Sequence, residues 1–276
     1  KGKEQLFTSL YLNKEPKKIR MNENIADTGP LNERQRLTEG AIRLKLEKRI
    51  AELTRENEQF AYIVSHDLQA PLRSITGFLE LIERRYADKL DDAGKQYIGF
   101  ALKGSQKLKG LVLDLLEFSR LNTTEFLFEQ VSLMDVLKEV TEELDQRVQA
   151  AAVKVEYRDL PVVEGVRKLL CTLFSQLIDN SIKFRSVETP RITIWSEQHS
   201  GYHLIHIIDN GIGIDPAFLE KVFVIFRKLN ADEKKFPGNG KGLAICKKIA
   251  ALHGWEIAAF PATGTGTRIT IKIKFA

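Results

Sequence analysis

The sequence predicts two domains of different class: an all-α helical hairpin, followed by an α+β two-layer sandwich. Apolar residues recur at helical spacing from about residue 41 to residue 122. Beyond residue 127, short alternating stretches typical of strands are interspersed with helical ones, which is typical of helices packed on one face of a mixed sheet. A chain of 276 residues is also long enough for two separate hydrophobic cores.

The composition excludes several other classes of protein. An apolar content of 43% and a charged content of 29% favour a soluble globular chain. No stretch approaches the roughly 20 apolar residues of a membrane span, so we expect a cytoplasmic protein whose segment here makes no membrane contact. The net charge of +5 does not predict a nucleic-acid partner, because basic and acidic side chains alternate without interleaved aromatics. Cys171 and Cys246 lack metal-binding spacing and are expected to be buried free thiols.

Residues 1–40 carry few structural signals, and we expect an N-terminal arm or the remnant of a sensor domain there. One long helix is predicted from about Ala41 to Tyr86, with a kink at Pro71, which lacks the amide hydrogen. Its apolar residues recur at alternating spacings of four and three, which predicts a parallel coiled coil and hence a homodimer. The heptad positions are Leu46, Ile50, Leu53, Asn57, Phe60 and Val64.

A second helix is predicted after a polar turn at residues 88–95, and it ends at Asn122-Thr123-Thr124. Because a single hairpin cannot bury its apolar stripe alone, two hairpins are expected to form a four-helix bundle. The second helix of this hairpin carries its apolar stripe at Tyr97, Ala101, Leu108, Leu111, Leu115 and Phe118.

The second domain covers residues 127–276, with a capping box at Ser132 that opens a helix to about Gln149. Further strands are expected at residues 153–157, 191–195, 202–208 and 269–275, and helices at residues 166–184 and 243–253.

A lone imidazole stands beside a carboxylate at His66 and Asp67. The heptad phase places His66 at a c position, which faces away from the seam, so another protein or domain can reach it. An isolated pair of this kind is more often an ordinary surface histidine. Residues 60–68, however, read Phe-Ala-Tyr-Ile-Val-Ser-His-Asp-Leu and resemble the phosphoacceptor hairpin of sensor histidine kinases, in particular the soluble subgroup linked to PAS domains and phytochromes.

Three boxes in the second domain suggest a nucleotide site. Asn180 and Lys183 share a helix face, where an amide oxygen can meet a magnesium ion and an ammonium a phosphate. Asp209 follows an apolar strand and must find a hydrogen-bond donor there. Gly211 and Gly213, which follow Asp209, would let the backbone approach a ligand closely. The third box is a glycine-rich loop that leads into a helix, whose N-terminus can bind phosphate. Its residues are Gly238, Gly240, Gly242 and Leu243.

These boxes resemble, in order, the ATP-binding domain that histidine kinases share with type II topoisomerases, the Bergerat or GHKL type. The resemblance implies ATP and Mg²⁺ as cofactors, with Asn180 as the metal ligand and Asp209 as the acceptor for the adenine amino group. It also assigns the pair Phe223 and Phe226, with Arg227 and Lys228, to the family's phenylalanine box, and residues 228–237 to a short lid over ATP. Gly264-Thr265-Gly266 is either the family's last glycine pair or a hairpin turn.

The resemblance implies a two-component sensor histidine kinase. Such an enzyme phosphorylates itself on His66, with Asp67 holding the Nδ1 proton, and passes the phosphoryl group to an aspartate of a response-regulator receiver domain. Two alternatives stay open: a non-catalytic dimeric scaffold that binds nucleotide, and a GHKL-type conformational ATPase. The ATPases carry a carboxylate as general base where this chain has Gln176, which cannot take a proton. Kinases usually carry Asn there, so Gln176 also departs, conservatively, from their pattern.

Overall fold

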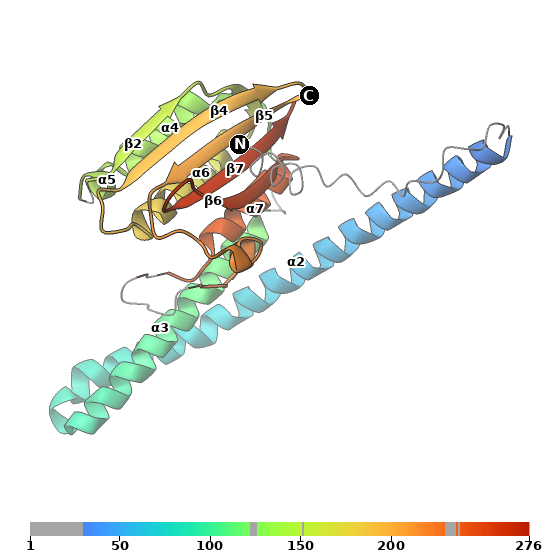
Figure 1. Cartoon of the computed structure of the whole chain (residues 1–276). Coiled ribbons are helices and arrows are strands. Elements are labelled where there is room, and N and C mark those ends of the chain that lie inside the picture. Colours follow the sequence, from blue (N-terminus) through green and yellow to red (C-terminus); the bar gives the residue numbers. More distant parts are fainter. Residues whose placement is uncertain (1–29, 122–125, 151, 230–235, 237, 276) are drawn as a thin grey trace. The chain divides into compact units, whose positions relative to one another are not determined.

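The computed structural model describes residues 30–121, 126–150, 152–229, 236 and 238–275. It divides into two compact units, Lys1–Thr123 and Thr124–Ala276. The first is here called the helical unit and the second the α/β unit, because all the strands belong to the second (Figure 1). The predicted fold class, a helical hairpin followed by an α+β domain, is confirmed.

The helical unit consists of α2 (Pro30–Tyr86), the short 3₁₀ helix η1 (Ala87–Lys89) and α3 (Asp92–Arg120). Helix α2 begins well before the predicted start at Ala41, because Pro30 suits the first turn of a helix, where its missing N–H costs no hydrogen bond. The helix continues through Pro71, and the predicted kink there stays a prediction. Most of the predicted N-terminal arm, residues 1–29, lies outside the described residues.

Helix α3 packs against the C-terminal part of α2 (Figure 1). Asp91 caps α3 by accepting a hydrogen bond of 2.7 Å from the backbone N–H of Gly94. Between the helices a hydroxyl pair, Thr76 Oγ1 and Ser105 Oγ, lies 2.6 Å apart and is buried, so its hydrogen bond fixes the register of the hairpin. The buried apolar side chains of the hairpin are Leu72, Leu102, Val112 and Leu116.

The residues of α3 that a single hairpin buries differ in part from the predicted stripe, of which Leu111, Leu115 and Phe118 are half-buried. Leu102, Ser105 and Val112 are buried, whereas Tyr97 of the predicted stripe is 69% exposed and Leu108 is 48% exposed. Helix α2 likewise leaves large apolar side chains in contact with solvent. The exposed set on the two helices includes Ile75, Phe78, Leu81, Tyr97, Phe100 and Leu108. A single hairpin therefore leaves a broad apolar surface uncovered.

The α/β unit is built on a five-stranded sheet in the order β2-β4-β5-β7-β6. Strand β2 pairs with β4 in parallel, and the other neighbours are antiparallel. A separate two-stranded antiparallel sheet joins β1 to β3. The strands are β1 (Glu129–Ser132), β2 (Lys154–Arg158), β3 (Val162–Gly165), β4 (Arg191–His199), β5 (Tyr202–Asp209), β6 (Glu256–Pro261) and β7 (Thr267–Lys274).

Helices cover one face of this sheet (Figure 1). Ser132 opens the first of them by accepting a hydrogen bond of 3.3 Å from the backbone N–H of Asp135, as the capping box predicts. The helix predicted to run to Gln149 is interrupted at Leu144, which separates α4 from α5. The helical elements of the unit are α4 (Leu133–Glu143), α5 (Asp145–Ala150), α6 (Arg167–Lys183), η2 (Pro216–Phe218), η3 (Lys221–Phe223) and α7 (Gly242–Leu252).

The core of the α/β unit lies between the sheet and the helices. Isoleucines at alternate positions of the central strands point toward the helices, and each fully buried one contributes about 1.5–3 kcal/mol. The largest fully buried side chains include Leu170, Leu173, Phe174 and Ile178 of α6, Ile192, Ile194, Ile205 and Ile271 of the sheet, and Ile245 and Ile249 of α7. This packing fixes the ends of α6, β5 and α7, which carry the site described next.

The two cysteines are free thiols, but only Cys246 is buried as predicted. Cys171 is half-buried, and its burial raises the pKa of the thiol to about 11. Across the described part of the chain, every helix is too short or too polar to cross a lipid bilayer.

Candidate functional sites

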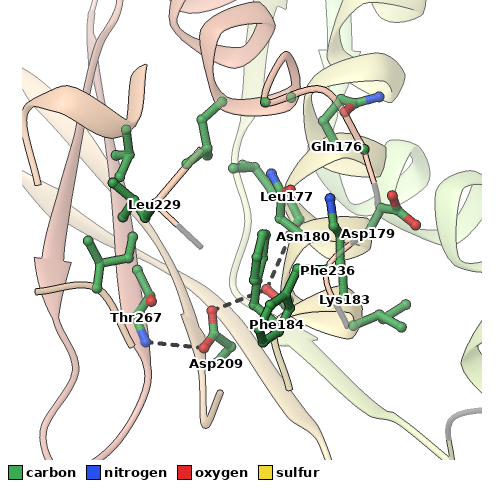
Figure 2. A pocket seen from close by; sticks show the side chains of 18 of the residues that line it. Gln176, Leu177, Asp179, Asn180, Lys183, Phe184, Asp209, Leu229, Phe236 and Thr267 are labelled. Carbon is green, nitrogen blue, oxygen red and sulfur yellow. Dashed lines mark hydrogen bonds between the residues drawn. The ribbon is translucent and has the colours of Figure 1, made fainter. Parts of the chain in front are cut away.

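A cavity of about 940 Å³ opens in the α/β unit, beside α6 and the start of α7. Its size falls within the range of small-molecule and cofactor sites. Helix α6 supplies one wall, and β5, β7 and the segment that leads into α7 supply the others (Figure 2). Segments far apart in the sequence therefore converge on one concave surface.

Asp209 stands at the end of β5, inside this cavity. Its Oδ1 accepts a backbone hydrogen bond of 3.1 Å from Thr267 N (Figure 2) and another of 2.9 Å from Gly211 N. Its Oδ2 accepts a hydrogen bond of 3.3 Å from Ser181 Oγ. Burial raises the pKa of the Asp209 carboxyl, while these three hydrogen bonds oppose the rise. The carboxylate is thus held in one orientation, with capacity left on Oδ2 to accept a hydrogen bond from a ligand.

The backbone packs closely around Asp209. A β-carbon on Gly266 would overlap the carbonyl oxygen of Asp209, and the φ angle of Gly266 is 112°, which side-chain-bearing residues rarely adopt. The turn at Gly264-Thr265-Gly266 therefore leads into β7 and also lets Thr267 reach the carboxylate. Both readings of this glycine pair are compatible with the structure.

The α6 wall presents Asn180 and Lys183 to the cavity. Lys183 lies near the glycine loop, which comprises residues 238–242. Its Nζ is 2.7 Å from the point where a β-carbon on Gly238 would sit. Burial lowers the pKa of Lys183, and the charge of Lys228 adds to this effect. Phe184 and Phe236 stack nearby, with ring centroids 5.2 Å apart and planes inclined by 25°. The cavity is therefore anionic at Asp209 and cationic near Lys183 and Lys228.

The glycine loop leads directly into α7, which begins at Gly242 and, among the described residues, has no side-chain cap on its first turn. The N-terminal amides of such a helix can bind anions, because they have no intrahelical acceptors. Gly240 O accepts a hydrogen bond of 3.1 Å from Phe226 N, which ties the loop to the segment before it. Of the lid predicted at residues 228–237, residues 230–235 and 237 lie outside the described residues.

Most of the predicted binding residues line this one cavity, and two do not. Gly211 lies outside the lining and donates its backbone N–H to Asp209, and Phe226 lies outside the lining and donates its backbone N–H to Gly240 O. Sequence reasoning missed Ser181, Thr267 and Phe236, although Ser181 follows Asn180 within the first box. The predicted residues on the wall are Asn180, Lys183, Asp209, Gly213, Arg227, Gly238, Gly240, Gly242 and Leu243.

A magnesium ion fits the donors of this cavity. Among the described residues, no group of three or more His, Cys, Asp or Glu side chains gathers as a metal site. Magnesium, however, usually takes only one or two protein oxygens, together with water and substrate phosphates. The amide oxygen of Asn180, next to a region that can hold phosphate, meets that requirement.

The helical unit carries the second candidate site. His66 Nδ1 lies 3.2 Å from Asp67 Oδ1, and the two side chains are 69% and 73% exposed. The opposite ring nitrogen, Nε2, is therefore open to another molecule. Nearby on the hairpin, a groove of about 320 Å³ is lined by Gln69, Leu72, Arg73, Lys109, Val112 and Leu113.

Two family models match the chain, one in each unit. Residues 56–124 match the His Kinase A (phospho-acceptor) domain, and residues 165–276 match the histidine kinase-, DNA gyrase B-, and HSP90-like ATPase domain. The first match includes His66, and the second includes the whole cavity lining described above.

Similar proteins include two cyanobacterial phytochromes. The chain is 38% identical over 221 residues to cyanobacterial phytochrome A of Nostoc sp. and 34% identical over 237 residues to the phytochrome-like protein Cph1 of Synechocystis sp.. These matches cover 80% and 83% of this chain but only 28% and 32% of the two relatives. Among solved structures, full-length ShkA in complex with AMPPNP shares the fold, with a TM-score of 0.56 and 23% identity over 79% of this chain and 46% of ShkA.

Proposed function

Since the chain carries the catalytic core of a sensor histidine kinase, we propose that it is an ATP-dependent protein-histidine kinase that phosphorylates His66. One observation supports this proposal above the others. The chain combines a cavity that holds an oriented carboxylate opposite cationic side chains with a separate, exposed imidazole whose Nδ1 faces a carboxylate. A binding scaffold or an ATPase has no need of the second feature.

In this proposal the cavity recognises ATP by its two chemically different ends. Asp209 Oδ2 accepts a hydrogen bond from the adenine amino group, which the fixed orientation of the carboxylate favours. Lys183 and the first amides of α7 hold the phosphates, because they provide positive charge and free donors. Asn180 holds Mg²⁺ through its amide oxygen, and the ion neutralises phosphate charge when it is bound.

Phosphoryl transfer then depends on the tautomer of His66. Asp67 accepts a hydrogen bond from the Nδ1 proton, so the lone pair of the neutral ring is on Nε2. Nε2 attacks the γ-phosphorus; the new N–P bond forms as the bond from that phosphorus to the β,γ-bridging oxygen breaks, and ADP leaves with the electron pair. No general base is required, because Nε2 carries no proton.

The exposed apolar surface of the hairpin supports a homodimer. Side chains such as Phe78, Tyr97 and Phe100 are more than half exposed in a single chain. A second hairpin would cover them and complete a four-helix bundle, with the heptads of α2 continuing the contact as a coiled coil. The partner in this proposal is a second copy of the chain.

The groove near His66 supports a receiver domain as the second partner. Gln69 and Arg73 continue the helix from His66, and Lys109 faces them from α3. The active site of a response-regulator receiver domain offers an aspartate as phosphoryl acceptor, so the basic groove complements an acidic partner. The kinase thereby acts in signal transduction.

Incubation of the full chain with ATP labelled on the γ-phosphate tests this function. We expect label on the protein that is stable in base and lost in acid, as phosphohistidine is. Release of free phosphate without labelled protein would identify a conformational ATPase. Nucleotide binding without either product would identify a scaffold, and both results contradict the proposal.

A further inference from the structure

Two carboxamides of α6 face the start of α7. Gln176 and Asn180 lie one turn apart on α6 and both line the cavity (Figure 2). The point where a β-carbon on Gly242 would sit is 2.8 Å from Gln176 Oε1 and 3.1 Å from Asn180 Nδ2. Gly242 therefore leaves room for two amide groups that any side chain at this position would displace.

The Asn180 amide has one unmet requirement. Its Nδ2 is buried and has no hydrogen-bond partner among the described residues. A buried donor without an acceptor destabilises the structure, so such groups are rare and need an explanation. Gln176 Oε1 is an acceptor that lies close to the same point, although it does not bond Nδ2 as the two side chains stand. Side chains four residues apart on a helix are neighbours, so a rotation of either amide would bring Oε1 and Nδ2 together.

We propose that Gln176 is a positioning residue that accepts a hydrogen bond from Asn180 Nδ2 and so turns Asn180 Oδ1 toward the cavity. This inference rests on the proposed function, in which that oxygen holds Mg²⁺. A carboxamide has one oxygen and one NH₂ group, and only the oxygen can bind a cation. If the amide of Asn180 turned over, its NH₂ group would face the ion and repel it.

The same arrangement gives a reason for glutamine at position 176. A glutamine oxygen accepts the hydrogen bond of Asn180 but cannot take a proton from water. Position 176 can thus orient the metal ligand without giving the cavity a general base for hydrolysis. Glutamine is also long enough to reach over Gly242, whose missing side chain provides the space.

The test compares ATP affinity in excess Mg²⁺ with ATP affinity in EDTA, measured by titration calorimetry on the full chain. In Gln176→Leu we expect the Mg²⁺-dependent gain in affinity to fall about three- to tenfold, the effect of one lost hydrogen bond, while affinity in EDTA is unchanged. Gln176→Glu keeps an acceptor oxygen and should retain the gain. Lys168→Leu, an exposed position on the same helix, is the control and should behave as wild type.

The same substitution made in an Asn180→Asp variant distinguishes a positioning role of Gln176 from a merely structural one. In Asn180→Asp both outer atoms are oxygens, so orientation no longer matters and the further change Gln176→Leu should cost nothing more. Equal losses in both backgrounds would overturn the inference. An undiminished Mg²⁺ effect in Gln176→Leu would also overturn it, with the proposed function intact. A wild-type protein that does not bind ATP would instead contradict the proposed function itself.

Discussion

Asp209 and His66 are the central side chains of the two candidate sites, and their surroundings differ. Asp209 is half-buried and receives hydrogen bonds from two backbone amides and a hydroxyl. His66 is 69% exposed and contacts one neighbouring carboxylate. A binding site for a small molecule gains from rigid, preorganised donors and acceptors. In the proposed function, the imidazole must meet a nucleotide and then another protein, so it has to stay accessible.

The largest effect should come from His66→Gln, which removes the acceptor and keeps a polar side chain on the same exposed helix face. We expect the γ-phosphate label on the protein to disappear completely, while calorimetry shows ATP affinity within about twofold of wild type. The two sites belong to separate units, so the loss should not pass from one to the other. Markedly weaker ATP binding in this variant would contradict the assignment of the two roles to separate units.

Asp209→Asn should have the next largest effect. The amide cannot replace the charged acceptor for the adenine amino group, so ATP affinity should fall about tenfold to a hundredfold, or ~1.5–3 kcal/mol. Folding should change little, because a neutral group costs less to bury than a carboxylate. Calorimetry and thermal unfolding together measure both quantities. Glu256→Gln, on an exposed position of the same sheet, is the matched control. An unchanged ATP affinity would make the carboxylate purely structural.

A smaller effect is expected from Lys109→Glu in the groove of the helical unit. Charge reversal should slow phosphoryl transfer to a cognate receiver domain about three- to tenfold at low salt, because attraction to an acidic partner becomes repulsion. Autophosphorylation should be unaffected. Lys95→Glu, at the other end of α3, carries the same change in charge and should leave transfer at the wild-type rate. If both variants slow transfer equally, the groove has no special role.

The smallest effect concerns His253, a histidine that contrasts with His66 in its environment. Its Nε2 accepts a hydrogen bond of 3.0 Å from Val166 N and its Nδ1 donates one of 2.8 Å to Ile249 O, so the neutral ring satisfies both contacts. Burial lowers the pKa of His253 below its usual 6.5, although the contact with Ile249 opposes this. The stabilisation is therefore complete above about pH 6.5 and is lost as pH falls through the lower folded-state value.

Thermal unfolding of the α/β unit between pH 7.5 and 5 measures this contribution. The melting temperature should fall with pH in the wild-type chain and fall less steeply in His253→Gln, which has no titrating ring. Burial also lowers the pKa values of His203 and His206, so these residues account for the part of the slope that remains. An identical slope in the variant would show that the ring contacts of His253 do not respond to protonation.

The sequence predicted the parts of this fold that depend on local pattern. Strands β5 and β7 lie where expected, because a short, continuous apolar run predicts the first and a strict alternation of apolar and polar residues predicts the second. Strands β1 and β3 were missed because each has only four residues and they pair with each other at long range. Strand β6 was missed because its centre is Ala258-Ala259, two residues with low strand propensity, and it ends in Pro261.

The same limit explains which residues of the cavity could not be predicted. Asp209 could be located from the strand before it, but Thr267 contacts it only through tertiary structure across 58 positions of sequence. Phe236 follows a charged stretch that gives no sign of its stacking on Phe184. Phe226, which the phenylalanine box suggested, does not line the cavity but donates its backbone N–H to Gly240 O. On α3, polar Ser105 pairs with Thr76 of α2 inside the hairpin, so hydropathy alone does not find every residue that a single hairpin buries.

The most direct measurement is the mapping of the phosphorylated residue. The full chain would be incubated with Mg²⁺ and ATP, digested at alkaline pH to preserve phosphohistidine, and sequenced by mass spectrometry. We predict phosphate on the imidazole of His66, with none on the neighbouring hydroxyl of Ser65, which is fully buried. Phosphate on any other residue, or none at all on a chain that binds ATP, would contradict the account.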